Sequence, residues 1–193
     1  MMILRTTGKD IADQAVTGNY VGIPYSKLDC QAFVEQVLKD LGVRKSDGSV
    51  YNWRGSNSMW RNFISWRGSI KECKEKFGDI PVGAFVFIIK YDGGEKEKGY
   101  NDDLGNASHV GLYLGTSPKP CMDSQGNRGV DYCSLNVFTH VGLMSMVDYY
   151  NEPIPPEEEM TPLEAVRLIR EDICLDSEYL KALETLTIYM RGV

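Results

Sequence analysis

The sequence has 193 residues, of which 42% are hydrophobic, and a formal net charge of −6. This length fits one domain of ordinary size with some residues to spare, and the apolar fraction is sufficient for a packed core. The acidic balance argues against a nucleic-acid partner, because a nucleic-acid-binding surface needs a basic patch. There is no run of 18 apolar residues, so we expect no membrane-spanning helix.

The cysteines and histidines do not have the spacing of a metal site. The five cysteines include no Cys-x-x-Cys pair, and there are two histidines in the sequence. We therefore expect no metal and no other cofactor. The first ten residues contain too short an apolar run for a signal peptide, so synthesis and folding in a reducing cytoplasm are expected.

The first part of the chain is predicted to be helical. Residues 9–17 carry apolar side chains at helical spacing and predict a short first helix. Gly-Ile-Pro-Tyr at 22–25 predicts a turn. Apolar residues then recur at the spacing of one buried helix face over residues 30–41. Asp29 is suited to cap the start of this second helix, and Gly42 to follow its end.

The middle of the chain predicts a sheet. Residues 46–69 show no sustained period and predict an irregular segment held by its aromatic side chains, and residues 71–77 predict a weakly helical turn. The apolar run at 84–89 predicts a buried strand, and alternation over 108–115 predicts a second strand after an exposed loop. Three more strand candidates follow, at residues 120–124, 130–135 and 141–149. Helices followed by about five strands predict an α+β fold with an antiparallel sheet.

The composition changes near residue 150. Residues 151–162 contain four prolines and three consecutive glutamates and predict a linker. Beyond it, apolar spacing over residues 163–193 predicts a helical appendage. The sequence therefore predicts a domain over residues 1–150, the linker and the appendage. Their oligomeric state is left open.

Cys30 is predicted to lie in the first turn of its helix. Unpaired backbone N–H groups and the helix dipole stabilise a thiolate at that position, which favours a nucleophilic cysteine. The alternative is a small buried hydrophobic residue, the commonest state of a free cysteine. The distinction depends on whether a general base lies nearby.

Both histidines occur in the tetrapeptide His-Val-Gly-Leu, but their surroundings differ. His109 begins a predicted strand, and Asp123 on the next strand can lie beside it and orient its imidazole toward Cys30. The neighbouring residues Ser124 and Gln125 are the alternatives for the group that orients the imidazole. No acid follows His140 at a corresponding place, so we interpret it as a sheet-edge histidine bonded to backbone or water.

Three segments, in order, resemble the NlpC/P60 cysteine peptidases. Residues 29–34 (Asp-Cys-Gln-Ala-Phe-Val) resemble the family's Asp-Cys-Ser-Gly-(Leu/Phe)-Val nucleophile motif, with Gln and Ala in place of Ser and Gly. Residues 77–87 resemble its Pro-Gly-Asp-Leu-Val-Phe-Phe strand, and residues 108–115 are similar to its Ser-His-Val-Gly-Ile-Tyr-x-Gly strand. The resemblance covers roughly residues 8–150.

The resemblance implies a papain-like α+β fold in which the catalytic cysteine starts a helix that packs on the antiparallel sheet. It implies Cys30 as nucleophile and His109 as base, with the third catalytic position falling on Asp123. Further contacts to the oxyanion or substrate are expected from the following residues: Tyr25, Asp29, Gln31, Ser108 and Ser124. The implied activity is hydrolysis of an amide bond in bacterial peptidoglycan stem peptides, of the γ-D-glutamyl–diamino acid type.

Other functions remain as alternatives. One is a different papain-like amidase or acyltransferase, of the CHAP or transglutaminase-like kind. Another is a non-catalytic phage or cell-wall binding protein on the same fold. The expected substrate is cell-wall material, which the enzyme could reach as an endolysin after phage-type release or as a cytoplasmic recycler of wall peptides.

Overall fold

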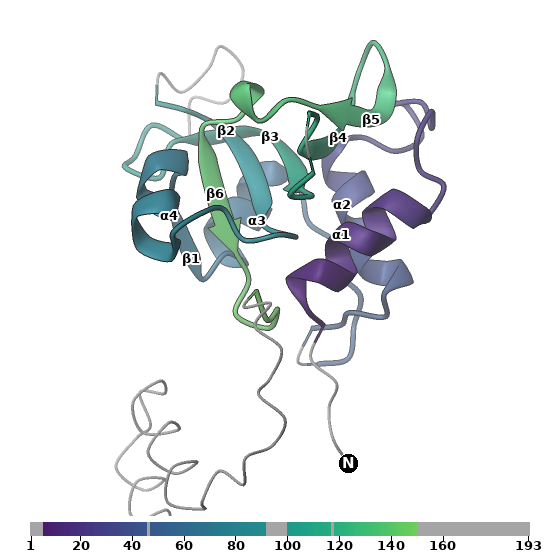
Figure 1. Ribbon diagram of the computed structural model, residues 1–193, viewed down its shortest axis with the longest axis horizontal. Coiled ribbons are helices and arrows are strands. Elements are labelled where there is room, and N and C mark those ends of the chain that lie inside the picture. The colour runs from purple at the N-terminus through teal and green to yellow at the C-terminus, as the bar shows by residue number, and fades with distance from the viewer. Residues whose placement is uncertain (1–5, 46, 92–99, 117, 150–193) are drawn as a thin grey trace, which may run out of the picture. The chain divides into compact units, whose positions relative to one another are not determined.

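The computed structural model describes residues 6–45, 47–91, 100–116 and 118–149. The predicted α+β class is confirmed: four helices pack on an open antiparallel sheet (Figure 1). The helices are α1 (Gly8–Thr17), α2 (Cys30–Asp40), α3 (Ser56–Asn62) and α4 (Ile70–Phe77), with a 3-10 turn at Leu135–Val137. The strands are β1 (Trp66–Ser69), β2 (Phe85–Lys90), β3 (Asn106–Tyr113), β4 (Cys121–Gln125), β5 (Gly129–Cys133) and β6 (His140–Leu143).

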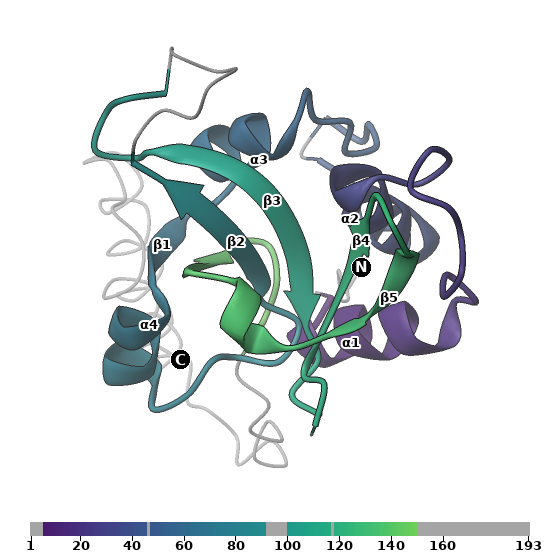
Figure 2. The same cartoon turned by 90° about the horizontal axis from the view of Figure 1, so that it is seen from above.

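The sheet order is β1-β6-β2-β3-β4-β5, and its neighbouring strands pair antiparallel. Helices α1 and α2 lie toward β4 and β5, and α3 lies against β3 (Figure 2). At the other end of the sheet, α4 packs on β1 and β6. Within the described ranges, no helix is long and apolar enough to span a bilayer.

The chain divides into two compact units, Met1–Asn151 and Glu152–Val193. The described residues belong to the first unit. The predicted linker at 151–162 and the predicted helical appendage at 163–193 lie outside the described residues.

The first two helices form where the sequence predicts them. The Thr7 side chain caps α1 by accepting from the Asp10 amide, and Asp10 bonds back to the Thr7 backbone. The α2 helix begins at Cys30 and ends at Asp40, and Gly42 follows in the left-handed region with φ of 74°. Both helices bury one apolar face.

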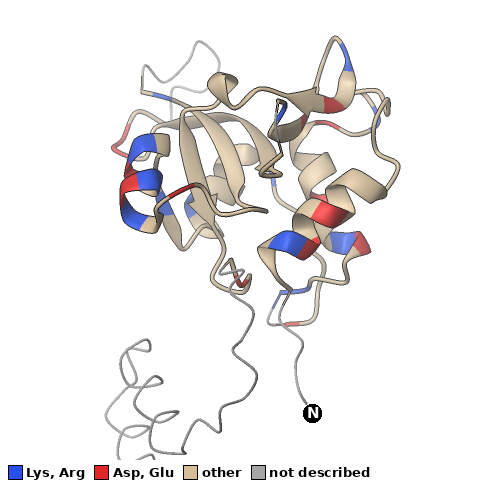
Figure 3. Ribbon diagram, viewed as in Figure 1, with Lys and Arg blue, Asp and Glu red and all other residues tan. Residues whose placement is uncertain are grey.

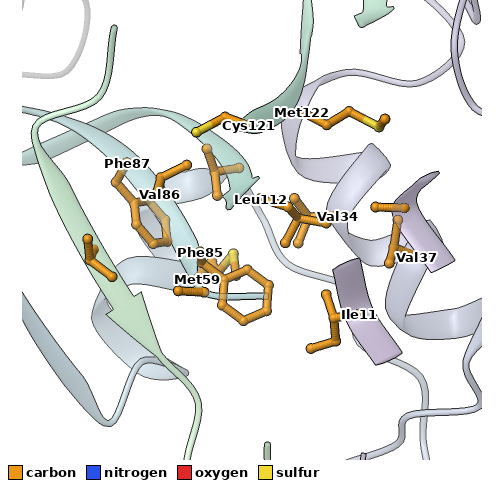
Figure 4. Packing of buried hydrophobic residues seen from close by; sticks show 14 of the residues in the cluster. Ile11, Val34, Val37, Met59, Phe85, Val86, Phe87, Leu112, Cys121 and Met122 are labelled. Carbon is orange, nitrogen blue, oxygen red and sulfur yellow. The ribbon is translucent and has the colours of Figure 1, made fainter. Parts of the chain in front are cut away.

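The core lies between these helices and the sheet (Figure 4). Phe85, Val86 and Phe87 of β2 and the alternate positions Val110 and Leu112 of β3 are fully buried, whereas Ile88 near the end of β2 is half-buried. From the helices, Ile11, Val34 and Val37 pack into the same cluster. Burial of these side chains holds α2 against β3 and β4, the strands that carry the candidate site.

The sequence interpretation of residues 46–77 was incomplete. The segment expected to be irregular contains α3 and β1, and the expected turn at 71–77 lies within the regular helix α4. The sheet therefore has six strands in the described part of the chain, not five. A four-residue strand has no periodicity of its own, and β1 forms because β6 pairs with it. The α4 helix is fixed by a capping box between Ser69 and Glu72.

The missed strand also changes the position of His140. Strand β6 lies between β1 and β2, so the expectation of a sheet-edge histidine was wrong. The His140 ring bonds to side chains: Nε2 is 3.1 Å from the Tyr91 hydroxyl and Nδ1 is 2.9 Å from Thr139 Oγ1. Strand β6 ends at Leu143, well short of the predicted 141–149.

Gly129 permits the chain before α2 to approach β5. It has φ of 69°, and a Cβ placed there would lie 2.2 Å from the carbonyl oxygen of Ile23.

We expect Gly129→Ala to lower the free energy of unfolding by about 3–5 kcal/mol, from left-handed strain plus this clash. Gly48, with φ of 81° and open space around it, is the matched control. Replacement of Gly48 by Ala should lower the free energy of unfolding by about 1–2 kcal/mol. Urea unfolding of both variants measures the difference, and equal losses would contradict the close approach.

Candidate active site

Cys30 occupies the first position of α2, where the chain is fixed by hydrogen bonds on both sides. The Asp29 carboxylate accepts from the Ala32 amide at 2.8 Å and caps the helix. The carbonyl of Leu28 accepts a hydrogen bond from the hydroxyl of Ser124 on β4. Cys30 itself is 8% exposed. Its side chain thus starts from the first turn of α2, beside the backbone N–H groups that have no partner within the helix.

The turn before α2 is tied to β5. The Gly22 amide donates to the Val130 carbonyl at 2.9 Å, and the Val130 amide donates to the Ile23 carbonyl at 3.0 Å. This turn brings the Tyr25 hydroxyl to Cys30. The pKa of Tyr25 is raised, first by burial and then by the nearby Cys30 and Asp29 and the hydrogen bond to Cys30. A phenol at this position can donate to the sulfur or to an oxygen bound beside it.

His109 lies on β3 next to a break in strand pairing. His109 pairs with Ile88 but the following pair joins Ile89 to Ala107, so Ser108 is an extra residue in β3. Such a bulge changes the direction of neighbouring side chains. The β3–β4 ladder runs from Gly111 opposite Asp123 toward the end of β3, so it does not include His109. Strands β3 and β4 are therefore not paired at His109. The start of α2 lies near this point, since the Leu28 carbonyl accepts from the Ser124 hydroxyl of β4.

The predicted contact between His109 and Asp123 is present. Nε2 of His109 lies 2.8 Å from Oδ2 of Asp123, and the Asp123 side chain is fully buried. Gly111 makes room for it, because a Cβ at Gly111 would lie 3.1 Å from the Asp123 Cβ and 2.9 Å from the ring of Phe138. Because Nε2 of the imidazole is bonded to Asp123, Nδ1 is the ring nitrogen left for Cys30.

The contacts of His109 stabilise its protonated ring. Burial alone would lower the pKa of His109, but hydrogen bonds to Asp123 and Cys30 and the charges of both groups raise it to about 9. The ring of Phe138 also stacks on that of His109, with centroids 6.0 Å apart and planes inclined by 13°. A protonated imidazole beside a sulfur at a helix N-terminus can form a thiolate–imidazolium pair.

Arg128 is a member of the site that sequence reasoning missed. It lies in the turn between β4 and β5, where basic and acidic segments come together (Figure 3). One guanidinium nitrogen forms an ion pair with Oδ1 of Asp123, and the other donates to the Tyr132 carbonyl at 3.2 Å. Gln125 also donates to Asp123, at 3.1 Å. Burial would raise the pKa of Asp123, but His109, Arg128 and Gln125 lower it overall, so the group stays a carboxylate.

The predicted residues thus fall into two groups. Cys30, His109, Asp123 and Tyr25 are brought together. Four others have structural contacts of their own. Asp29 caps α2, and the buried Ser124 bonds to Leu28. Ser108 is exposed, with its hydroxyl 3.3 Å from the Ile88 carbonyl, and Gln31 bonds to residues 53 and 55. The Arg128 contact follows from a hairpin turn that brings it back to Asp123, which spacing alone did not reveal. The stacking of Phe138 likewise depends on the folded chain.

The described ranges contain no group of three His, Cys, Asp or Glu side chains that could hold a metal ion. Comparisons with protein-family models, with curated proteins and with solved structures found no match to this chain. The functional interpretation therefore depends on the sequence motifs and on the geometry described above.

The two histidines should titrate at opposite ends of the neutral range. Burial lowers the pKa of His140, with a smaller opposing effect of Glu72, whereas that of His109 is about 9. Imidazole nitrogen NMR against pH measures both. We expect Asp123→Asn to lower the pKa of His109, while Asp131→Asn on the same hairpin leaves it nearly unchanged, because Asp131 bonds to Arg128 and not to the ring. A His109 that titrates below its ordinary 6.5 in the native protein would contradict the paired geometry.

The same shift makes stability depend on pH. The folded pKa of His109, about 9, lies above its ordinary value of 6.5. Its contribution to the free energy of unfolding is therefore fully present below about pH 6.5 and is lost as the pH rises through about 9. In Asp123→Asn this loss should occur at a lower pH.

Proposed function

We propose that this protein is a cysteine peptidase that hydrolyses an amide bond in bacterial peptidoglycan stem peptides, on a papain-like fold of the NlpC/P60 type. The observation that carries the proposal is the contact of His109 with both Asp123 and Cys30. A buried cysteine without function would need neither an imidazole nor a helix start beside it. The three motifs in the order of that family support the same assignment.

The reaction proceeds by acyl transfer through Cys30. Its thiolate attacks the carbonyl carbon of the scissile amide, and the carbonyl oxygen becomes an oxyanion. The His109 imidazolium then gives its proton to the amine nitrogen, the carbon–nitrogen bond breaks, and a thioester remains on Cys30. The now neutral His109 takes a proton from water, whose oxygen attacks the thioester. Collapse of this intermediate releases the carboxylic acid and restores the thiolate–imidazolium pair.

The other groups act on charge and orientation. Asp123 holds the His109 ring and stabilises its positive charge, and Arg128 keeps Asp123 ionised. The backbone N–H of Cys30 and the Tyr25 hydroxyl are suited to receive the oxyanion, since both lie at the sulfur. The exposed Asp29 beside Cys30 fits a positively charged amine on the substrate. That preference and the motif order favour a γ-D-glutamyl–diamino acid bond.

Selective alkylation tests the nucleophile. Burial raises the pKa of Cys73 to about 11 and that of Cys133 to about 12, so both serve as internal controls of low reactivity. With iodoacetamide at neutral pH, we expect Cys30 to react at least about tenfold faster than either control. Alkylation of Cys30 should be slower in His109→Ala but not in His140→Gln. Mass spectrometry of the labelled peptides gives the rates, and a Cys30 that reacts only on unfolding would contradict the proposal.

Hydrolysis of defined stem peptides tests the reaction itself. Cys30→Ala should abolish cleavage, and Asp123→Asn should lower kcat by about 10²-fold or more, because it changes the orientation and charge of the catalytic imidazole. His140→Gln is the matched control and should retain activity. Product masses distinguish water from an added amine as the acceptor, and so a hydrolase from an acyltransferase. If the wild-type protein binds stem peptides and forms no product, it is a binding protein.

A further inference from the structure

Two polar side chains of α2 fasten a distant loop beside the nucleophile. Gln31 follows Cys30 directly, and its amide nitrogen donates to the Trp53 carbonyl while its amide oxygen accepts from the Gly55 amide at 2.5 Å. Glu35, one turn later, accepts from the Trp53 amide and from Gln31, the latter at 2.8 Å. Both atoms of the Gln31 amide are thus bonded within the protein. Trp53 is 3% exposed, and its ring packs on Phe63 with centroids 5.5 Å apart.

The same loop continues into α3 and bonds to the strand of the catalytic histidine. The Ser56 hydroxyl donates to the carbonyl of Ala107, and the Asn57 side chain accepts from the Ala107 amide at 2.7 Å. Ala107 lies two residues before His109 in β3. Both polar side chains are buried, and Figure 2 shows α3 alongside β3. Residues 53–57, here called the brace, therefore connect the helix of Cys30 with the strand of His109.

We propose that the brace sets the position of Cys30 relative to His109, and that Gln31 and Glu35 are positioning residues of the active site. The inference rests on the proposed peptidase function. Apolar packing between α2 and β3 is not directional, whereas the hydrogen bonds of the brace fix the register of both elements. The bulge at Ser108 makes such a restraint necessary, because β2 does not hold this part of β3 in a continuous ladder.

The brace also accounts for the glutamine that follows the nucleophile. Both N–H donors of the Gln31 amide are used within the protein, on Glu35 and the Trp53 carbonyl, and its oxygen accepts from the Gly55 amide, so the side chain is committed to the loop and has no donor left for a substrate. Gln31 and Glu35 are four residues apart, so both side chains lie on the same face of α2.

Variants of Glu35 test the brace. Glu35→Ala removes the acceptor for the Trp53 amide, whereas Glu35→Gln keeps a carbonyl oxygen there. We expect Glu35→Ala to lower kcat by about 10- to 100-fold, since a misplaced catalytic group slows reaction steeply. Glu35→Gln should remain within about threefold of wild type. Gln36→Ala is the matched control, because Gln36 makes a similar bond to Asp40 at 2.7 Å on the same helix and does not reach the loop.

The pKa of His109 in the free protein provides a second measurement. Part of its rise comes from Cys30, so withdrawal of the sulfur in Glu35→Ala should lower it, with His140 unchanged. Gln31→Ala should act in the same direction and serves if Glu35→Ala does not fold. If Gln31 instead binds substrate, Gln31→Ala raises KM and leaves the free-protein titration of His109 as in wild type, which overturns the inference.

The two proposals fail in different ways. A wild-type protein that cleaves no stem peptide and whose Cys30 is inert contradicts the peptidase function. A wild-type protein that cleaves, together with Glu35→Ala and Gln31→Ala variants that cleave equally well and show the same His109 titration, contradicts the brace alone. Rescue by Glu35→Gln of both kcat and the His109 pKa would support it.

Discussion

The buried hydrogen bond between His109 and Asp123 is the interaction on which the candidate site depends. A fully buried carboxylate is costly unless its oxygens are bonded, and here His109, Gln125 and Arg128 supply the donors. Because Asp123 stays ionised, it keeps the imidazole oriented and protonated. The ring of Phe138 in turn stacks on one face of the imidazole. Removal of Asp123 would therefore deprive the His109 imidazolium and the Arg128 guanidinium of the carboxylate that they share.

The backbone around this contact has little freedom. Gly111 must lack a side chain for Asp123 and Phe138 to approach the strand, and Gly129 must be glycine for the turn before α2 to reach β5. These two close approaches bring the helix start and the hairpin to the same end of the sheet. In consequence, Cys30 meets His109 where β3 and β4 separate. The site is formed by three elements that are distant in sequence.

The proposed brace adds a further restraint of the same kind. Apolar burial brings α2 and α3 onto β3, and polar contacts then determine how far along the strand each one lies. A thiolate and an imidazolium need a separation within hydrogen-bonding reach, which packing alone defines loosely. Directional bonds from Gln31, Glu35 and Asn57 can define it closely. This division between packing and hydrogen bonding is why substitutions of Gln31 and Glu35 are expected to affect rate more than folding.

The sequence by itself determined those elements whose pattern is local. An Asp cap with helical apolar spacing set the start of α2 at Cys30, and strict alternation set the buried and site-facing positions of β3. Antiparallel succession of β3 and β4 was enough to place Asp123 beside His109. These features depend on neighbours a few residues or one hairpin away.

Only the tertiary structure decided the rest. Strand β1 exists because β6 pairs with it, and that pairing turns His140 from an expected edge residue into one on an inner strand. Phe138 and Gln31 acquire their contacts from segments that the fold brings together, and no local period marks them. Short segments carry too little propensity to specify themselves, so their structure and their partners follow from long-range burial and hydrogen bonding.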